Sequence, residues 1–304
     1  MIMKQILNHL VAFVTVVVWG STFVFTKLLL IDGLSAAQIF TLRFIIAYVL
    51  LTGWSLMQKS RRWKCGSWRD ELLMVALGVT GGSVYFLAEN SALNYTTTTN
   101  TSLIVCSCPL VASVLIGMFY KSERMSRVQA LGALMAVAGV SVVILNGHFV
   151  LHLSPVGDTL ALIANLCWAV YSLLLIPVNK RYDAVFITRK VFFYGLLTMI
   201  PYFLLVPDEA TLFLSPSTIH FTPSTIANLL FLGCVASMAC FLAWTWVMKK
   251  LGAVVATNYV YINPVATILF AWWILSEQIT PYFLIGTVLI LIGMYLADRK
   301  SDKQ

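Results

Sequence analysis

Three ionisable side chains, Lys27, Arg43 and Glu89, lie inside long apolar stretches of the sequence. A charged group in membrane hydrocarbon is costly, so it usually pairs with another charge or faces water. We expect the three to form an electrostatic cluster near one membrane surface that takes part in gating or ion coupling. Within it, Glu89 pairs with a basic neighbour or carries a coupling proton, and Lys27 joins the cluster or snorkels to the interface. No matching buried charge is expected near the opposite surface.

Aromatic and amide side chains form a second set, deeper in the apolar stretches. Tryptophan is usual at a membrane interface, but at mid-depth it needs a reason. A central cavity that binds a small, partly apolar solute would supply one, and packing or hydrogen bonding between helices is the alternative. The predicted substrate-binding residues are Trp19, Tyr85, Trp168, Tyr171, Trp244, Asn258, Tyr261 and Asn263.

Two prolines, Pro109 and Pro264, lie near the middle of two such stretches. A proline inside a helix removes a backbone hydrogen bond and bends the helix. In lipid, the freed carbonyl needs a partner from protein, water or a ligand, so paired breaks predict a binding site beside them. Cys106 and Cys108 are two residues apart on the expected helix, so we expect them to point to different faces as packing residues.

The elements that position these residues must be membrane helices. The 304-residue chain is 60% hydrophobic and 11% charged, whereas soluble domains are roughly 45–50% apolar and about 25% charged. This composition argues against a soluble enzyme. A membrane helix needs about 20 apolar residues, so ten helices would use most of the chain. The predicted spans are 10–30, 36–57, 72–92, 98–119, 128–146, 156–177, 188–206, 224–247, 254–275 and 281–297.

The positive charges lie on one side of this predicted arrangement. Apart from Lys27 and Arg43, all of the 20 Lys and Arg residues fall at the N-terminus, the C-terminus or alternate connections. Since cytoplasmic loops carry the excess of Lys and Arg, we expect both termini of a multi-pass membrane protein in the cytoplasm. The connections expected outside are 31–35, 93–98, 147–155, 207–223 and 276–280. Membrane orientation thus explains the net charge of +8, and we expect no nucleic-acid partner.

The two halves of the sequence repeat the same motifs in the same order. A shift of 155 aligns Phe86-Leu87-Ala88 with Phe241-Leu242-Ala243 and Pro109 with Pro264, and a shift of 154 aligns Ser122-Glu123 with Ser276-Glu277. Each unit holds five helices, an odd number, so the second copy enters the membrane from the opposite side. This predicts an inverted-topology repeat, with units at 1–150 and 151–304.

These motifs, together with Leu42-Arg43-Phe44 and Trp19-Gly20-Ser21, resemble the EamA-type family of the drug/metabolite transporter superfamily. The likeness covers nearly the whole chain, in two copies. It implies ten helices around a central cavity, with the fifth helix of each half at the periphery. It also implies a bacterial inner-membrane exporter of amino acids or other metabolites.

The prediction is an all-α secondary transporter that exports a small metabolite, such as an amino acid, by alternating access. Its partners would be the solute, the lipid bilayer and protons as a coupling ion. A passive facilitator and a multidrug efflux carrier are the alternatives. A membrane-embedded enzyme would need clustered carboxylates or histidines at one interface. The sequence has no phosphate-binding loop, metal-ligand spacing or nucleophile elbow, so we expect no enzyme, no cofactor and no metal.

Overall fold

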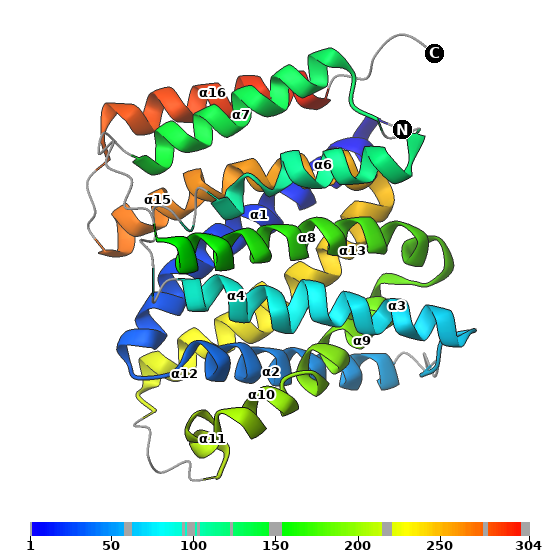
Figure 1. Cartoon of the computed structure of the whole chain (residues 1–304), viewed down its shortest axis with the longest axis vertical. Coiled ribbons are helices and arrows are strands. Elements are labelled where there is room, and N and C mark those ends of the chain that lie inside the picture. The colour runs from blue at the N-terminus through cyan, green and yellow to red at the C-terminus, as the bar shows by residue number, and fades with distance from the viewer. Residues whose placement is uncertain are drawn as a thin grey trace.

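The computed structural model describes residues 2–57, 63–92, 95, 101, 104–121, 124–145, 154–214, 221–275 and 279–298. Every regular element among them is helical (Figure 1). Eight helices are long and apolar enough to cross a membrane, and two shorter apolar helices, Cys108–Phe119 and Pro281–Ala297, bring the number to ten. The prediction of an all-helical membrane protein is therefore confirmed. The repeat motifs Ser122-Glu123 and Ser276-Glu277 lie outside the described residues.

The helices of the two halves are as follows. The first half holds α1 (Ile2–Ile31), α2 (Ala36–Met57), α3 (Trp68–Gly78), the π-helical η1 (Val79–Ser83), α4 (Val84–Ala92), α6 (Cys108–Phe119) and α7 (Arg127–Leu145). The second half holds α8 (Pro155–Arg181), α9 (Ala184–Leu197), α10 (Ile200–Leu205), α11 (Pro207–Leu214), α12 (Pro223–Leu230), the π-helical η4 (Phe231–Ala239), α13 (Cys240–Leu251), α14 (Ala253–Asn258), the 3₁₀ turn η5 (Tyr259–Ile262), α15 (Asn263–Leu275) and α16 (Pro281–Asp298).

Polar side chains determine where several helices begin. The Ser67 hydroxyl accepts from the Asp70 N–H at 3.2 Å, and the Asp183 carboxylate accepts from the Phe186 N–H at 2.9 Å. Each satisfies a backbone donor that the first helical turn leaves open. One helix was not predicted: α11 forms within 207–223, where we expected only a connection. Its first turn carries Asp208 and Glu209, whose charges suit a helix N-terminus.

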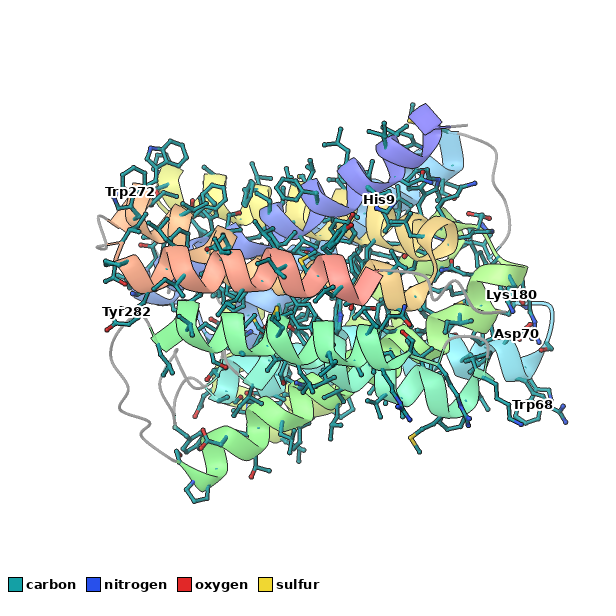
Figure 2. All side chains as sticks on the ribbon, turned by 90° about the horizontal axis from the view of Figure 1, so that it is seen from above. His9, Trp68, Asp70, Lys180, Trp272 and Tyr282 are labelled. Atoms are coloured by element: carbon teal, nitrogen blue, oxygen red, sulfur yellow. The ribbon has the colours of Figure 1, made fainter. Side chains whose placement is uncertain are left out.

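The spanning helices run between two ends of the molecule. Figure 1 shows both chain termini at the same end, and Figure 2 shows Trp68, Asp70 and Lys180 there too. We call this the terminal end. Trp272 and Tyr282 lie at the opposite end, which α1 reaches at Ile31 (Figures 1 and 2).

Helices α7 and α16 lie side by side along one edge of the molecule (Figure 1), as the family resemblance implied for the fifth helix of each half. Glycines bring their backbones together. A β-carbon added to Gly139 would lie 2.7 Å from the Ile290 nitrogen, and one added to Gly132 would lie 2.5 Å from the Ala297 nitrogen. Small residues permit such close approach between membrane helices. The pair leaves the remaining eight spans to surround the centre.

Candidate functional site

A cavity of about 260 Å³ lies among α1, α2, α4, α6, α8, α13 and α15. It extends from Trp19 and Trp168, at mid-helix, to Lys27 and Leu30, which are exposed near the end of α1. The cavity therefore opens at the end away from the termini, which we call the cavity end. Its lining consists of Trp19, Thr22, Phe23, Thr26, Lys27, Leu30, Ile39, Phe40, Arg43, Tyr85, Phe86, Glu89, Asn90, Val105, Cys106, Cys108, Trp168, Phe241, Val260 and Asn263.

Tryptophans from both halves of the chain form the floor of the cavity. The rings of Trp19 and Trp168 meet edge to face, with centroids 5.4 Å apart, and Trp244 lies 5.1 Å from Trp19. Trp168 also contacts Tyr171, one turn further along α8, at 5.2 Å. Such contacts between aromatic rings are stabilising, and large rings fill the space below the cavity. The floor therefore separates the cavity from the terminal end.

The π-helical segment η4 holds two cavity residues in place. The carbonyl of Ala236 accepts a hydrogen bond from the Trp19 indole nitrogen at 3.0 Å, and the Ser237 hydroxyl accepts one from Arg43 Nε at 2.8 Å. A π-turn within a longer helix is uncommon and often marks a functional site. Here it anchors an aromatic side chain and a cation on neighbouring walls of one cavity.

The cavity contains charges of both signs, held by neutral partners. The Arg43 guanidinium lies over the Phe86 ring, 4.9 Å from its centroid, and the Glu89 carboxylate accepts from the Tyr85 hydroxyl at 2.9 Å. Arg43 and Glu89 attract each other electrostatically, but the described residues include no direct ion pair between them. Both side chains are buried, with 4% and 6% of their surface exposed. Lys27 completes the charged set at the mouth of the cavity.

Both prolines lie at helix breaks beside the cavity. Pro109 lies in the first turn of α6, and Pro264 follows the 3₁₀ turn η5. The buried Asn165 side chain on α8 supports the first break by donating to the Ile104 carbonyl at 2.5 Å and the Ser107 hydroxyl at 2.9 Å. At the second break, the Thr267 hydroxyl contacts the Gly20 carbonyl at 3.0 Å and so ties α15 to α1.

The predicted site residues divide into two groups. The cavity brings together Trp19, Tyr85, Trp168, Asn263, Lys27, Arg43 and Glu89. Tyr171, Trp244, Asn258 and Tyr261 are buried outside its lining. Tyr171, Trp244 and Asn258 lie closer to the terminal end than the cavity does, because α8 and α13 end there and α14 begins there (Figure 1). Tyr261 lies between the lining residues Val260 and Asn263 and packs instead against Val140 of α7 and Ile290 of α16. Among the described residues, the Trp168 and Trp244 indole nitrogens, the Tyr261 hydroxyl and the Asn263 amide oxygen have no hydrogen-bond partner.

Several lining residues were not predicted. Phe86 and Phe241 were overlooked as site residues, although the repeat aligned them with each other, and both line the cavity. Asn90 lines the cavity and Asn165 supports the helix break beside it. Both are amides within apolar stretches, which is a signal that could have identified them. Cys106 and Cys108 pack in two different hydrophobic clusters, as expected of packing residues. Both also line the cavity, which was not expected, because the helix is interrupted at Ser107.

The terminal end is closed by a second polar network, which corrects the expectation of no buried charge there. Asp70 is 6% exposed, pairs with Arg181 and accepts from the Tyr182 hydroxyl at 2.8 Å. Glu71 pairs with Lys190 and accepts from the Tyr194 hydroxyl.

Arg189 is a further buried charge at this end. It is 3% exposed and donates to the Ser55 hydroxyl at 2.5 Å. Sequence reasoning placed Arg189 and Lys190 at the very start of the predicted span 188–206, beside a connection. In the structure α9 begins at Ala184, so both residues lie deeper within the helix. The network joins α3, α8 and α9 across the closed end.

Comparison with known proteins gives a consistent result over the full chain. The model of the EamA-like transporter family matches residues 6–145 and 155–297. An uncharacterized transporter of Archaeoglobus fulgidus is 29% identical over 97% of this chain and 99% of its own length. A "Probable terminal-alkyne amino-acid exporter" of Streptantibioticus cattleyicolor is 25% identical over 94% of this chain and 92% of its own. A solved crystal structure with 19% identity has the same fold, with a TM-score of 0.74 over 95% of this chain and 96% of that one.

Proposed function

Since the chain belongs to the EamA-like transporter family, we propose that it exports a small metabolite, such as an amino acid, across a bacterial inner membrane by alternating access. The protein is a membrane transporter and not an enzyme. The nature of the solute, the direction of transport and the coupling ion are the proposed parts. An amino-acid solute agrees with the name of the Streptantibioticus relative, a "Probable terminal-alkyne amino-acid exporter".

The observation that carries the proposal is a cavity open at one end and closed at the other. Charged and aromatic side chains line it, as in sites that orient a small solute through a few polar groups on an apolar wall. The tryptophan floor lies between the cavity and the terminal end, and the Asp70 and Glu71 networks join helices at the terminal end itself. A transporter that alternates between two openings must hold one end closed while the other is open.

The predicted residues outside the lining have a place in this cycle. We propose that Tyr171, Trp244, Asn258 and Tyr261 contact the solute when the terminal end opens. Buried polar atoms without a partner are costly in a protein interior. The Trp244 indole nitrogen and the Tyr261 hydroxyl are such atoms among the described residues. A cavity that reaches them would supply water or solute as a partner.

Proton coupling through Glu89 is part of the same proposal. Its carboxylate is buried in the cavity wall and accepts a hydrogen bond from the Tyr85 hydroxyl. It also interacts electrostatically with Arg43. A carboxylate in this position can bind a proton in one state of the transport cycle and release it in another. The positive charges of Lys27 and Arg43 would favour the deprotonated form of Glu89 in states that bring them close to it.

Transport in vesicles tests these proposals. Purified protein is reconstituted into liposomes that are loaded with one amino acid at a time. The exchange of this internal amino acid for the same labelled amino acid outside is then measured. An imposed proton gradient, acid outside, is then applied. We expect exchange of at least one amino acid and a gradient-driven rise in flux that Glu89→Gln abolishes. Exchange without any response to the gradient would indicate a passive facilitator. Transport of unrelated cationic drugs alone would indicate the multidrug alternative.

A further inference from the structure

We propose that Arg43 and Glu89 together recognise the two charges of a zwitterionic amino acid, with Arg43 on the carboxylate and Glu89 on the ammonium group. This inference rests on the proposed function and specifies which protein side chains bind the charged groups of the solute. The two side chains come from α2 and α4 and line one cavity. Arg43 and Glu89 do not hydrogen-bond to each other: Arg43 donates to Ser237, and Glu89 accepts from Tyr85.

The Arg43 side chain is oriented and yet has donors to spare. One donor, Nε, is taken by Ser237, and the flat guanidinium rests on the Phe86 ring. The guanidinium makes no other hydrogen bond with the described residues, so its outer edge keeps two N–H groups for a ligand. Paired N–H groups of arginine match the two oxygens of a carboxylate, which makes this the anion-binding side of the cavity.

The Glu89 side chain offers the opposite charge. The Tyr85 hydroxyl donates to Oε1 and holds the carboxyl group in one orientation. The other oxygen, Oε2, makes no hydrogen bond with the described residues. An ammonium group carries three donors and no acceptor, so it suits this free oxygen. A ligand with one charge alone would leave either the cation or the anion of the protein uncompensated in a buried site.

Aromatic walls define the rest of the ligand. Trp19, Trp168, Phe86 and Phe241 lie beyond the charged pair and form the deeper part of the cavity. Flat apolar side chains pack well against such rings. The geometry therefore points to an amino acid with an aromatic or large apolar side chain, lying with that side chain toward the tryptophan floor.

Three probes that differ only in charge test the inference. L-Phenylalanine carries both charges, phenethylamine lacks the carboxylate, and 3-phenylpropionate lacks the ammonium group. Binding to the full-length protein in lipid nanodiscs is measured by calorimetry for wild type, Arg43→Gln, Glu89→Gln and the control Lys250→Gln, which removes an exposed charge at the end of α13.

We expect wild type and Lys250→Gln to bind L-phenylalanine at least tenfold more tightly than either singly charged probe. Arg43→Gln should remove the advantage over phenethylamine, because L-phenylalanine then loses the partner of its carboxylate. Glu89→Gln should remove the advantage over 3-phenylpropionate in the same way. Equal affinity of wild type for the three probes overturns the inference, and this arm requires no variant to fold.

The vesicle exchange assay separates the two levels of the proposal. Exchange of small solutes with no preference for zwitterions overturns the charge assignment and leaves the proposed function standing. Absence of exchange for every amino acid overturns the proposed function. If either Gln variant is not monodisperse, Arg43→Lys and Glu89→Asp replace it. Each keeps its charge, and each should weaken L-phenylalanine binding while preserving the preference over the singly charged probes.

Discussion

At the scale of single residues, two of the three tryptophans of the cavity floor have different hydrogen-bonding roles. The Trp19 indole nitrogen donates to the Ala236 carbonyl, whereas the Trp168 nitrogen has no partner among the described residues. We expect Trp19→Phe to destabilise the protein by about 1 kcal/mol, measured by thermal unfolding in detergent. Trp168→Phe should leave stability nearly unchanged and weaken solute binding several-fold. The same stability loss in both variants would contradict this difference.

Cys65 provides a chemical probe of the closed terminal end. Burial, and then the hydrogen bond and negative charge of Glu71, raise the pKa of the Cys65 thiol to about 11. Because the thiolate is the reactive form, maleimide should modify Cys65 slowly near neutral pH and faster as the pH approaches this pKa. Glu71→Gln removes the negative charge and should lower the pKa, so modification at about pH 8 should become faster.

Peptide mass spectrometry can follow the modification of Cys65 alone. The control is Glu209→Gln, which changes a carboxylate bonded to Ser35 on the far side of the molecule. An equal increase in both variants would show that general loosening, and not the local charge, had changed the reactivity.

At the scale of elements, the contact between α7 and α16 depends on glycine. A β-carbon at Gly139 would meet backbone at 2.7 Å, whereas one at Gly53 on α2 would meet nothing within 4 Å. We expect Gly139→Ala to lower the midpoint of thermal unfolding by several degrees. Gly53→Ala should be neutral or stabilising by up to about 1 kcal/mol, because alanine favours a helix over glycine. Equal effects at the two positions would show that α7 and α16 do not pack this closely.

The broken helix before α6 depends on Asn165. Replacing it with Leu would leave the Ile104 carbonyl without the amide donor that now lies 2.5 Å away. We expect a loss of about 1–2 kcal/mol in stability, the upper range for hydrogen bonds between membrane helices, together with weaker solute binding from the displaced cavity wall. Leu162→Ala on the exposed face of the same helix serves as the control for thermal unfolding.

Sequence could predict the spans and part of the cavity, for identifiable reasons. Long apolar stretches are required of helices that cross a membrane, so they predict the spans. Prolines cannot continue a regular helix, so the two paired prolines predict the helix breaks. Tyr171 lies three positions beyond Trp168 on α8, which is less than one helical turn of about 5.4 Å. Only Trp168 lines the cavity. That difference depends on how far the tryptophan floor fills the centre, which no single helix specifies. Arg189 was misplaced because the start of α9 depends on its Asp183 cap.

At the scale of the whole molecule, the orientation in the membrane remains to be tested. The termini and Lys180 lie at one end, and Trp272 and Tyr282 lie at the other (Figures 1 and 2). We expect an impermeant thiol reagent to label Asp208→Cys in intact cells, and Lys64→Cys only after the cells are opened. Labelling of Lys64→Cys in intact cells would show that the orientation is the opposite of the predicted one. The cavity would then open to the cytoplasm.

The two π-helical segments bear on the history of the chain. Shifted by 155 residues, η1 (Val79–Ser83) falls at 234–238, inside η4 (Phe231–Ala239). A π-turn accommodates one residue more than the α-helical turn it replaces, so each half carries an insertion at the same place. One insertion in an ancestral five-helix protein, followed by duplication of its gene, would account for both. In the second half η4 anchors Arg43 and Trp19, both from the first half. The solute site would then be younger than the irregularity on which it is built.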